Sequence, residues 1–128
     1  MTQSIEIIRG VRFNGQQLTK TKTINEEEAV ALDVVVEPST SLEEHALGLD
    51  VSQVKAVFFG ADQAGSLRIN SNTADPLTLS AETPILWADG DAEDNPLGVS
   101  DVTKIFITND STTGQLIVNF RGLLSSPL

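Results

Sequence analysis

Hydrophobic and polar residues alternate along most of the chain, and a period of two residues is typical of β-strands. Residues 5–13 carry Ile, Ile, Arg, Val and Phe on one set of alternate positions, with mostly polar residues between them. Asn14-Gly15 follows, and both residue types tolerate the positive φ angles of a tight hairpin turn. Residues 18–24 then alternate Thr and Lys, as expected of a solvated or edge strand. The first 25 residues are therefore predicted to form a basic N-terminal arm or hairpin.

Two adjoining segments give opposite local predictions. In residues 29–36 every second side chain is a large aliphatic one, so this segment is predicted to be a strand with one buried face. Ser41-Leu42-Glu43-Glu44 fits a capping box, in which the serine oxygen accepts a backbone N–H and the last glutamate reaches back. This motif predicts one short helical turn near residues 41–47.

The chain also contains an internal repeat. LDVSQVKAVFFGADQAGSLRIN, at residues 49–70, matches LGVSDVTKIFITNDSTTGQLIVN, at residues 97–119, with one residue inserted in the second copy. The matched positions are mainly apolar, with Val57, Phe58 and Phe59 answering to Ile105, Phe106 and Ile107. Each copy is predicted to be a hairpin of two strands around a polar turn. The two hairpins are expected in facing sheets, related by approximate symmetry, and the repeat is interpreted as a way of building one core.

Short strands are also predicted at residues 77–81 and 84–87, and residues 88–98 are interpreted as a polar loop. This makes eight or nine short strands with little helix. The pattern predicts an all-β protein with an antiparallel β-sandwich, jelly-roll-like or immunoglobulin-like. A chain of 128 residues is long enough to bury a core, so residues 1–128 are expected to form a single β-sandwich domain.

Composition and charge argue against several classes of function. The formal net charge is −10, whereas a DNA- or RNA-binding protein needs a basic face, so nucleic acid is not an expected partner. No apolar run approaches the ~20 residues of a transmembrane helix, and MTQSIEIIRGVRF lacks the pattern of a signal peptide. Neither a membrane partner nor secretion is therefore expected. Cysteine is absent, which excludes disulfides and thiolate sites.

The charge is unevenly distributed along the chain. Residues 1–25 carry a net charge of +3, and residues 26–128 carry −13. A basic segment on an acidic body would let neighbouring copies attract each other. Ordinary strand-surface charge is the alternative interpretation of the same pattern.

No catalytic residue is assigned from the sequence. His45 is the only histidine, and the chain has no G-x-S-x-G motif that would mark a nucleophilic serine. Glycine-rich phosphate loops and a dinucleotide fingerprint are also missing. The protein is therefore expected not to be an enzyme and to need no cofactor.

One acidic cluster, at residues 89–95, is dense enough to be considered as a metal site. Calcium binds about six to eight oxygen ligands, and Asp89, Asp91 and Glu93 are the candidate calcium ligands. Their spacing resembles the start of an EF-hand loop, but the glycine and the bidentate glutamate that such a loop requires are missing. A solvated acidic loop is therefore the favoured interpretation.

The segment from Leu49 to Leu124 resembles small β-rich virion proteins of tailed bacteriophages. The similar features are the Val-Ser-x-Val-x-x-Ile/Val-Phe motif of both repeat copies, the middle segment at residues 77–87, and the ending Ile-Phe-Ile-Thr-Asn…Gly-Gln-Leu-Ile-Val-Asn. The resemblance implies a capsid decoration (cement) protein that stabilises the phage head through subunit contacts. The expected location is the capsid exterior of the virion, after synthesis in the host cytoplasm. The expected partners are the major capsid protein and the chain's own copies, as a homo-oligomer such as a trimer.

Candidate contact residues follow from the basic segment, the single tryptophan and the apolar tail; they are Arg9, Arg12, Lys20, Lys22, Trp87, Leu123 and Leu124. Tryptophan is enriched in interface hot spots, although packing in the core or at an edge is the favoured interpretation of Trp87. Two other functions stay open. One is a carbohydrate- or receptor-binding module with an aromatic platform around Trp87, and the other is a minor tail or head-tail component.

Overall fold

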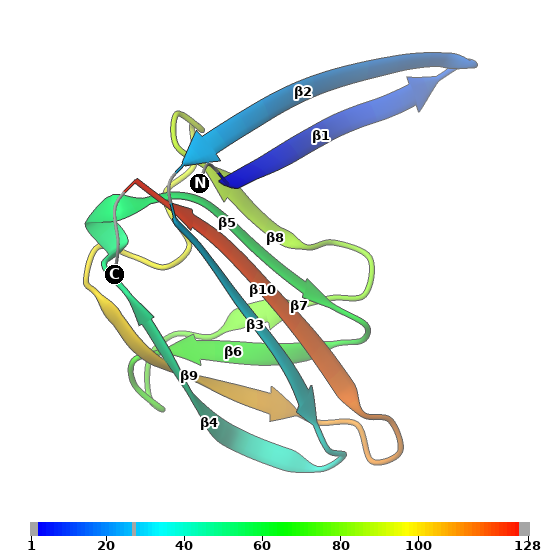
Figure 1. The fold of residues 1–128 in the computed structure, drawn as a ribbon. Helices are drawn as coiled ribbons and strands as arrows, with labels where there is room; N and C mark the ends of the chain where they lie inside the picture. Colours follow the sequence, from blue (N-terminus) through cyan, green and yellow to red (C-terminus); the bar gives the residue numbers. More distant parts are fainter. Residues whose placement is uncertain (1–2, 27, 126–128) are drawn as a thin grey trace.

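The computed structural model describes residues 3–26 and 28–125, and this part of the chain is all-β (Figure 1). Besides a single 3-10 turn (η1, Val51–Gln53), its regular elements are ten strands. These are β1 (Gln3–Phe13), β2 (Gln16–Glu26), β3 (Glu28–Val36), β4 (Thr40–Leu49), β5 (Val54–Ala61), β6 (Gly65–Ile69), β7 (Leu77–Leu79), β8 (Ile85–Ala88), β9 (Val102–Asn109) and β10 (Leu116–Leu124).

Eight of the strands form two antiparallel four-stranded sheets that face each other. Sheet I has the order β3-β10-β5-β8, and sheet II has the order β4-β9-β6-β7. Four antiparallel pairs are nested in sequence: β3 pairs with β10, β4 with β9, β5 with β8 and β6 with β7. The chain thus has the topology of one long hairpin whose two arms are wrapped together around the core. This is the jelly-roll arrangement. The predicted β-sandwich is therefore confirmed, and the topology selects the jelly roll from the two alternatives.

The core lies between the two sheets and is built from the inward-facing half of each strand. Strand β3 illustrates the pattern, because Val34 and Val36 are buried while Val35 between them is exposed. At the centre, the rings of Phe59 and Phe120 lie 4.7 Å apart between centroids and are tilted by 47°. Such tilted aromatic pairs add to the stabilisation that comes from burying the two rings.

The internal repeat is confirmed as a core-building unit, but its two copies are not hairpins. β5 and β6 lie in different sheets, and so do β9 and β10. Instead, the first strand of each copy pairs with the second strand of the other: β5 with β10, and β9 with β6. The link between the two strands is thus an arch over the edge of the core. This arch lets both strands of one copy direct their apolar residues into the same core from opposite sides.

The symmetry extends beyond the similar sequences. The strands can be matched as β3 with β7, β4 with β8, β5 with β9 and β6 with β10. When the members of each matched pair exchange places, the strand order of sheet I becomes that of sheet II. The jelly roll thus consists of two four-strand halves, and sequence similarity survives only in the central strands of the sheets.

The predicted helical turn near residues 41–47 is wrong, because this segment is part of strand β4. Buried Leu47 and Leu49 alternate with exposed residues, and β9 supplies the hydrogen-bonding partners that a helix would have provided internally. The Ser41–Glu44 segment does not cap a helix. Its Leu42 has a positive φ of 54°, and the Leu42 N–H donates to Thr108 Oγ1 at 3.0 Å. Strand pairing therefore overrides the capping preference.

Asn109 is the buried polar residue of the described core, and it holds one corner of the sandwich together. Its side chain is fully hydrogen-bonded to three loops. Nδ2 donates to the carbonyls of Val36, Glu37 and Gly114, and Oδ1 accepts from Gln63 Nε2 and Ser111 N–H. The β3–β4 turn and both arches are thereby fixed to each other.

The first prediction concerns the central aromatic pair. Phe120→Ala is expected to lower the free energy of unfolding by about 3–5 kcal/mol, because it removes a large buried ring and leaves a cavity. Phe13→Ala is the matched control; Phe13 is 68% exposed, so its loss should change the free energy by less than about 0.5 kcal/mol. Urea unfolding followed by circular dichroism measures both. Equal effects of the two substitutions would contradict the placement of the core.

Candidate functional site

Strands β1 and β2 form a separate two-stranded sheet that extends away from the sandwich (Figure 1). They pair in register from Gln3 opposite Glu26 to Phe13 opposite Gln16. The turn between them is Asn14-Gly15, with φ angles of 49° and 80°. Both angles are positive, as a tight two-residue hairpin turn requires. The predicted N-terminal hairpin is thus confirmed.

The hairpin has one apolar and basic face and one mainly polar face. Residues directly opposite each other in an antiparallel pair point to the same side. Combining this rule with the register gives an inner face whose apolar and basic residues are Ile5, Ile7, Arg9, Val11, Phe13, Leu18, Lys20, Lys22 and Ile24, with Gln3, Gln16 and Glu26 at its ends. The outer face carries a row of threonines on β2, and Ile8 is its large aliphatic residue. The two faces therefore offer different chemistry to a partner.

The inner face of the hairpin base rests on the outside of sheet I. Ile7 is only 3% exposed, although it lies outside the core cluster between the sheets. Ala56, Ala88 and Leu123 are likewise buried without belonging to that cluster. β1 and β2 contact β10, and β2 also contacts β5, so the hairpin base covers these outward-facing residues. The hairpin is thus attached by a small second core.

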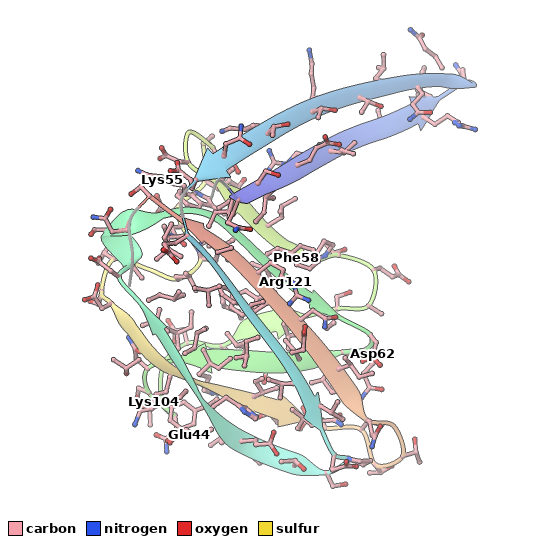
Figure 2. All side chains as sticks on the ribbon, in the orientation of Figure 1. Glu44, Lys55, Phe58, Asp62, Lys104 and Arg121 are labelled. Atoms are coloured by element: carbon pink, nitrogen blue, oxygen red, sulfur yellow. The ribbon has the colours of Figure 1, made fainter. Side chains whose placement is uncertain are left out.

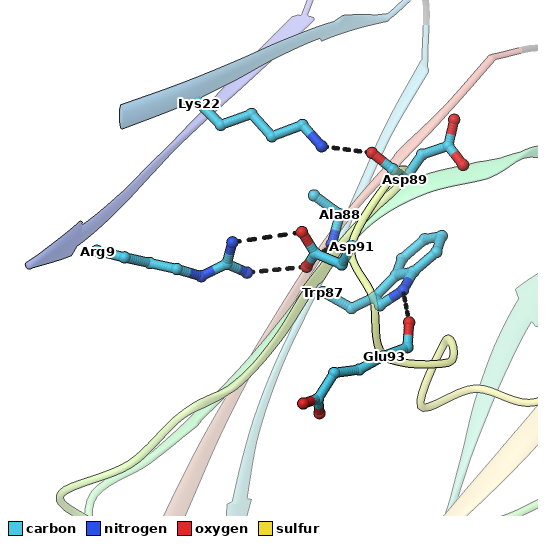
Figure 3. A network of polar contacts seen from close by, with 7 residues as sticks. All are labelled: Arg9, Lys22, Trp87, Ala88, Asp89, Asp91 and Glu93. Atoms are coloured by element: carbon cyan, nitrogen blue, oxygen red, sulfur yellow. Dashed lines mark hydrogen bonds and ion pairs between the residues drawn. The ribbon is translucent and has the colours of Figure 1, made fainter. Parts of the chain in front are cut away.

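Polar contacts strengthen this attachment, as Figure 3 shows. The Arg9 guanidinium donates to both carboxylate oxygens of Asp91, at 3.3 and 2.9 Å, and the Ala88 N–H donates to Asp91 Oδ2 at 2.9 Å. Lys22 Nζ donates to the carbonyl of Asp89. We call these contacts of Arg9 and Lys22 with the β8–β9 loop the clasp.

The clasp changes the ionisation of Asp91. The hydrogen bonds from Arg9 and from the Ala88 N–H favour the charged carboxylate, so they lower the pKa of Asp91 below its ordinary value. Burial opposes this effect but is outweighed, and the attraction of the Arg9 and Lys22 charges adds to the lowering. The carboxylate therefore stays charged, and the clasp stays intact, at neutral pH.

Beyond the base, the hairpin has no cover from the described part of the chain. Residues 8–21 are all exposed (Figure 2). Val11, Phe13 and Leu18 lie on the inner face and are 63%, 68% and 52% exposed. We call these three residues the tip cluster. A group of large apolar side chains in solvent is typical of an interaction site.

The basic residues predicted as contacts divide into two groups. Arg9 and Lys22 are used in the clasp within the chain. Arg12 donates to Gln17 at 3.4 Å, and Lys20 makes no polar contact with the described residues. Lys20 therefore remains available to a partner beside the tip cluster on the inner face, and Arg12 is exposed on the outer face.

The predicted calcium ligands do not converge (Figure 3). Asp91 is held by Arg9, Asp89 Oδ2 lies 3.9 Å from Lys55 Nζ, and the side chain of Glu93 is exposed. Within residues 3–26 and 28–125, no three His, Asp or Glu side chains are grouped so that they could hold a metal ion. The acidic loop serves instead as the receiving side of the clasp.

The other predicted contact residues are used inside the fold. Leu123 and Leu124 are 1% and 0% exposed, so their prediction as contact residues of a free apolar tail is wrong: they end β10, with Leu123 under the hairpin and Leu124 in the core. Of the apolar tail predicted at Leu123–Leu128, residues 126–128 lie outside the described residues. Trp87 packs against the core, and its indole N–H donates to the Glu93 carbonyl at 2.9 Å.

Catalytic groupings are not assembled in the described residues. His45 Nε2 lies 2.6 Å from Glu43 Oε2, and no nucleophilic side chain of the described residues bonds to this imidazole. A surface hollow of about 460 Å³ lies beside the two arches, and Asp110 is the one ionisable residue among the described residues that line it.

Sequence reasoning missed two exposed apolar residues on the outside of sheet I. Val35 is 51% exposed and Ile117 is 39% exposed, and they face each other across β3 and β10. The signal for them was present in the sequence. Val34-Val35-Val36 and Leu116-Ile117-Val118 are uninterrupted apolar runs, where a strand with one solvated face would have a polar middle residue.

Comparison of the chain with protein family models, with curated proteins and with solved structures finds no match. Among the described residues, none forms a helix with the length and apolar character needed to cross a membrane.

The second prediction concerns the clasp. Asp91→Asn is expected to speed amide hydrogen exchange in residues 3–8 and 21–26 about two- to fivefold at neutral pH, because a partly exposed ion pair contributes modestly. In the unsubstituted chain, the charged Asp91 carboxylate contributes fully to the attachment of the hairpin above the ordinary aspartate pKa of about 4. This contribution is lost as the pH falls through the lowered pKa that Asp91 has in the folded protein. Nuclear magnetic resonance measures exchange residue by residue.

Lys20→Gln is the control for this experiment, because it removes a positive charge from the same hairpin without breaking a contact in the described structure. It should leave exchange unchanged. Equal acceleration by the two substitutions would show that general charge, rather than the clasp, attaches the hairpin.

Proposed function

We propose that the protein is a non-enzymatic structural protein that assembles through its β1–β2 hairpin. The proposed setting is the virion of a tailed bacteriophage, in which the chain decorates the capsid exterior and stabilises the head through contacts with its own copies and with the major capsid protein. The setting is supported by the resemblance of residues 49–124 to small β-rich virion proteins. A jelly roll supports many functions, so the fold alone does not decide between them.

The observation that carries the proposal is the tip cluster. Three large apolar side chains stand on one face of an extended hairpin, at a distance from the body that anchors it. Exposing them to water is unfavourable by about 1.5–3 kcal/mol for each side chain that a partner would fully bury. We call the β1–β2 hairpin, residues 3–26, the arm. An arm of this kind reaches across the boundary between two subunits, as an assembly protein requires.

The body of the protein suits the same role. Its two sheets pack around a continuous apolar core, and the clasp and the hairpin base fix the direction in which the arm leaves. A fixed arm loses little conformational entropy on binding. Trp87 does not favour the carbohydrate-binding alternative, because it packs against the core and its N–H is bonded within the chain.

The third prediction tests the arm. The double variant Val11→Ser, Phe13→Ser is expected to raise the dissociation constant for self-association at least about tenfold, because aromatic and aliphatic anchors dominate most interfaces. Light scattering across a concentration series measures it. Val99→Ser is the matched control, since Val99 is an exposed apolar residue (97%) on the body, away from the arm. Unchanged assembly of the arm variant would contradict the proposal.

The virion setting is tested separately. Antibodies raised against the purified chain should label the outer surface of phage particles from the source of the sequence in immunoelectron microscopy, and the chain should sediment with those particles. Particles that lack the chain would overturn the virion setting, while leaving the role of the arm in self-association to the light-scattering experiment.

A further inference from the structure

We propose that the tip cluster of one chain docks on a second copy of the same chain, on the outer face of sheet I at Val35 and Ile117. We call this pair the receiving patch. The inference rests on the proposed function and deepens it by naming the partner surface. It makes the interface head to tail, because the two contacting surfaces are different parts of the molecule.

The first argument is that the chain already makes a contact of this kind with itself. The hairpin base places Ile5, Ile7 and Ile24 over outward-facing apolar residues of sheet I. The tip cluster continues the same hairpin face, and the receiving patch continues the same sheet face. The proposed contact therefore extends an interface that the fold contains, with the two halves contributed by different copies.

The second argument is geometric. Leu123, under the hairpin base, and Ile117, in the receiving patch, point to the same side of β10 and are six residues apart in the sequence. At about 3.3 Å per residue, this separation is roughly 20 Å. The hairpin leaves sheet I at the end that is remote from the patch and extends away from it (Figure 1). A chain therefore cannot cover its own patch, whereas a neighbouring copy can.

The third argument is charge complementarity. The receiving patch is bordered by Glu37, which bonds to the neutral side chain of Gln115, and by Asp62, which accepts the Ile117 N–H at 2.8 Å (Figure 2 labels Asp62). No cation of the described chain pairs with either carboxylate. Lys20 lies beside the tip cluster on the inner face and also lacks a partner there. Each surface thus offers apolar side chains together with an unpaired charge of opposite sign.

The receiving patch is also well ordered for docking. Val35 directly precedes Val36, whose carbonyl accepts from the buried Asn109. The adjoining turn and arch are fixed by the same side chain. A preorganised surface binds without first having to be ordered. The contact is nevertheless small, so we expect association in the micromolar range rather than a permanent oligomer.

The fourth prediction uses complementation between two defective variants. The arm variant Val11→Ser, Phe13→Ser keeps an intact patch, and the patch variant Val35→Thr, Ile117→Thr keeps an intact arm. Threonine retains the β-branched shape that suits a strand, so the patch variant should fold. Each variant alone is expected to associate at least about tenfold more weakly than the unsubstituted chain. An equimolar mixture should form complexes of two chains and no larger ones, because it contains one working arm and one working patch for each pair.

Light scattering up to about 1 mM protein follows all the samples, and near-ultraviolet circular dichroism of Trp87 confirms folding. Val35→Lys is a second patch variant that adds a positive charge facing Lys20, and it should weaken association as well. Val99→Ser should behave like the unsubstituted chain.

The outcomes separate the two proposals. A mixture that stays monomeric, or a patch variant that assembles normally, would overturn docking at the receiving patch. Assembly through the arm would still be supported if the arm variant associates more weakly than the unsubstituted chain. Normal assembly of the arm variant would overturn both. An unsubstituted chain that remains monomeric at all concentrations would overturn docking between copies, and particle labelling would then decide the proposed function by itself.

Discussion

The face-to-face burial of the two four-stranded sheets is the constraint on which the rest of the structure depends. Once Val34, Val36 and Phe120 must point into the core, the residues between them must point outward, whatever their polarity. In sheet I this rule places several apolar side chains on the outer face. The fold covers those near Leu123 with the hairpin base and leaves those near Ile117 in solvent. The attachment of the arm and the exposure of the receiving patch therefore have the same origin: the hairpin base covers only part of the apolar outer face of sheet I.

Periodicity and turn chemistry were enough to predict the class of fold, because both act between residues that are close in sequence. The two-residue period gave the strands, and Asn14-Gly15 gave the hairpin. Strand pairing could not be predicted in the same way. Two strands joined by a short link can pair with each other or arch over a core, and both arrangements satisfy the alternation of β5 and β6. The same limit explains why residues 41–47 were predicted as a helical turn: only the presence of β9 makes a strand the better solution.

The candidate site was predictable in its charge and not in its geometry. The sequence separates a basic first segment from an acidic remainder, and Arg9 indeed contacts an acidic residue. That residue is Asp91 of the same chain, however, so part of the attraction expected between copies is used to hold the hairpin. The acidic loop that resembled a calcium site acts as the other half of this contact. Composition identified the attraction, and only the fold distinguishes a contact within a chain from one between chains.

A head-to-tail contact has consequences that a symmetric one lacks. Only the two end copies of a growing assembly would carry a vacant surface, one an arm and the other a patch, so the contact generates a closed ring if these ends meet and an open filament if they do not. Closing a ring makes the final contact intramolecular, and several weak contacts can then hold an assembly that one contact could not. The clasp matters for this choice, because the direction of the arm sets the rotation from one copy to the next. By fixing that direction through Arg9 and Lys22, the chain would select a single closed arrangement from a range of open ones.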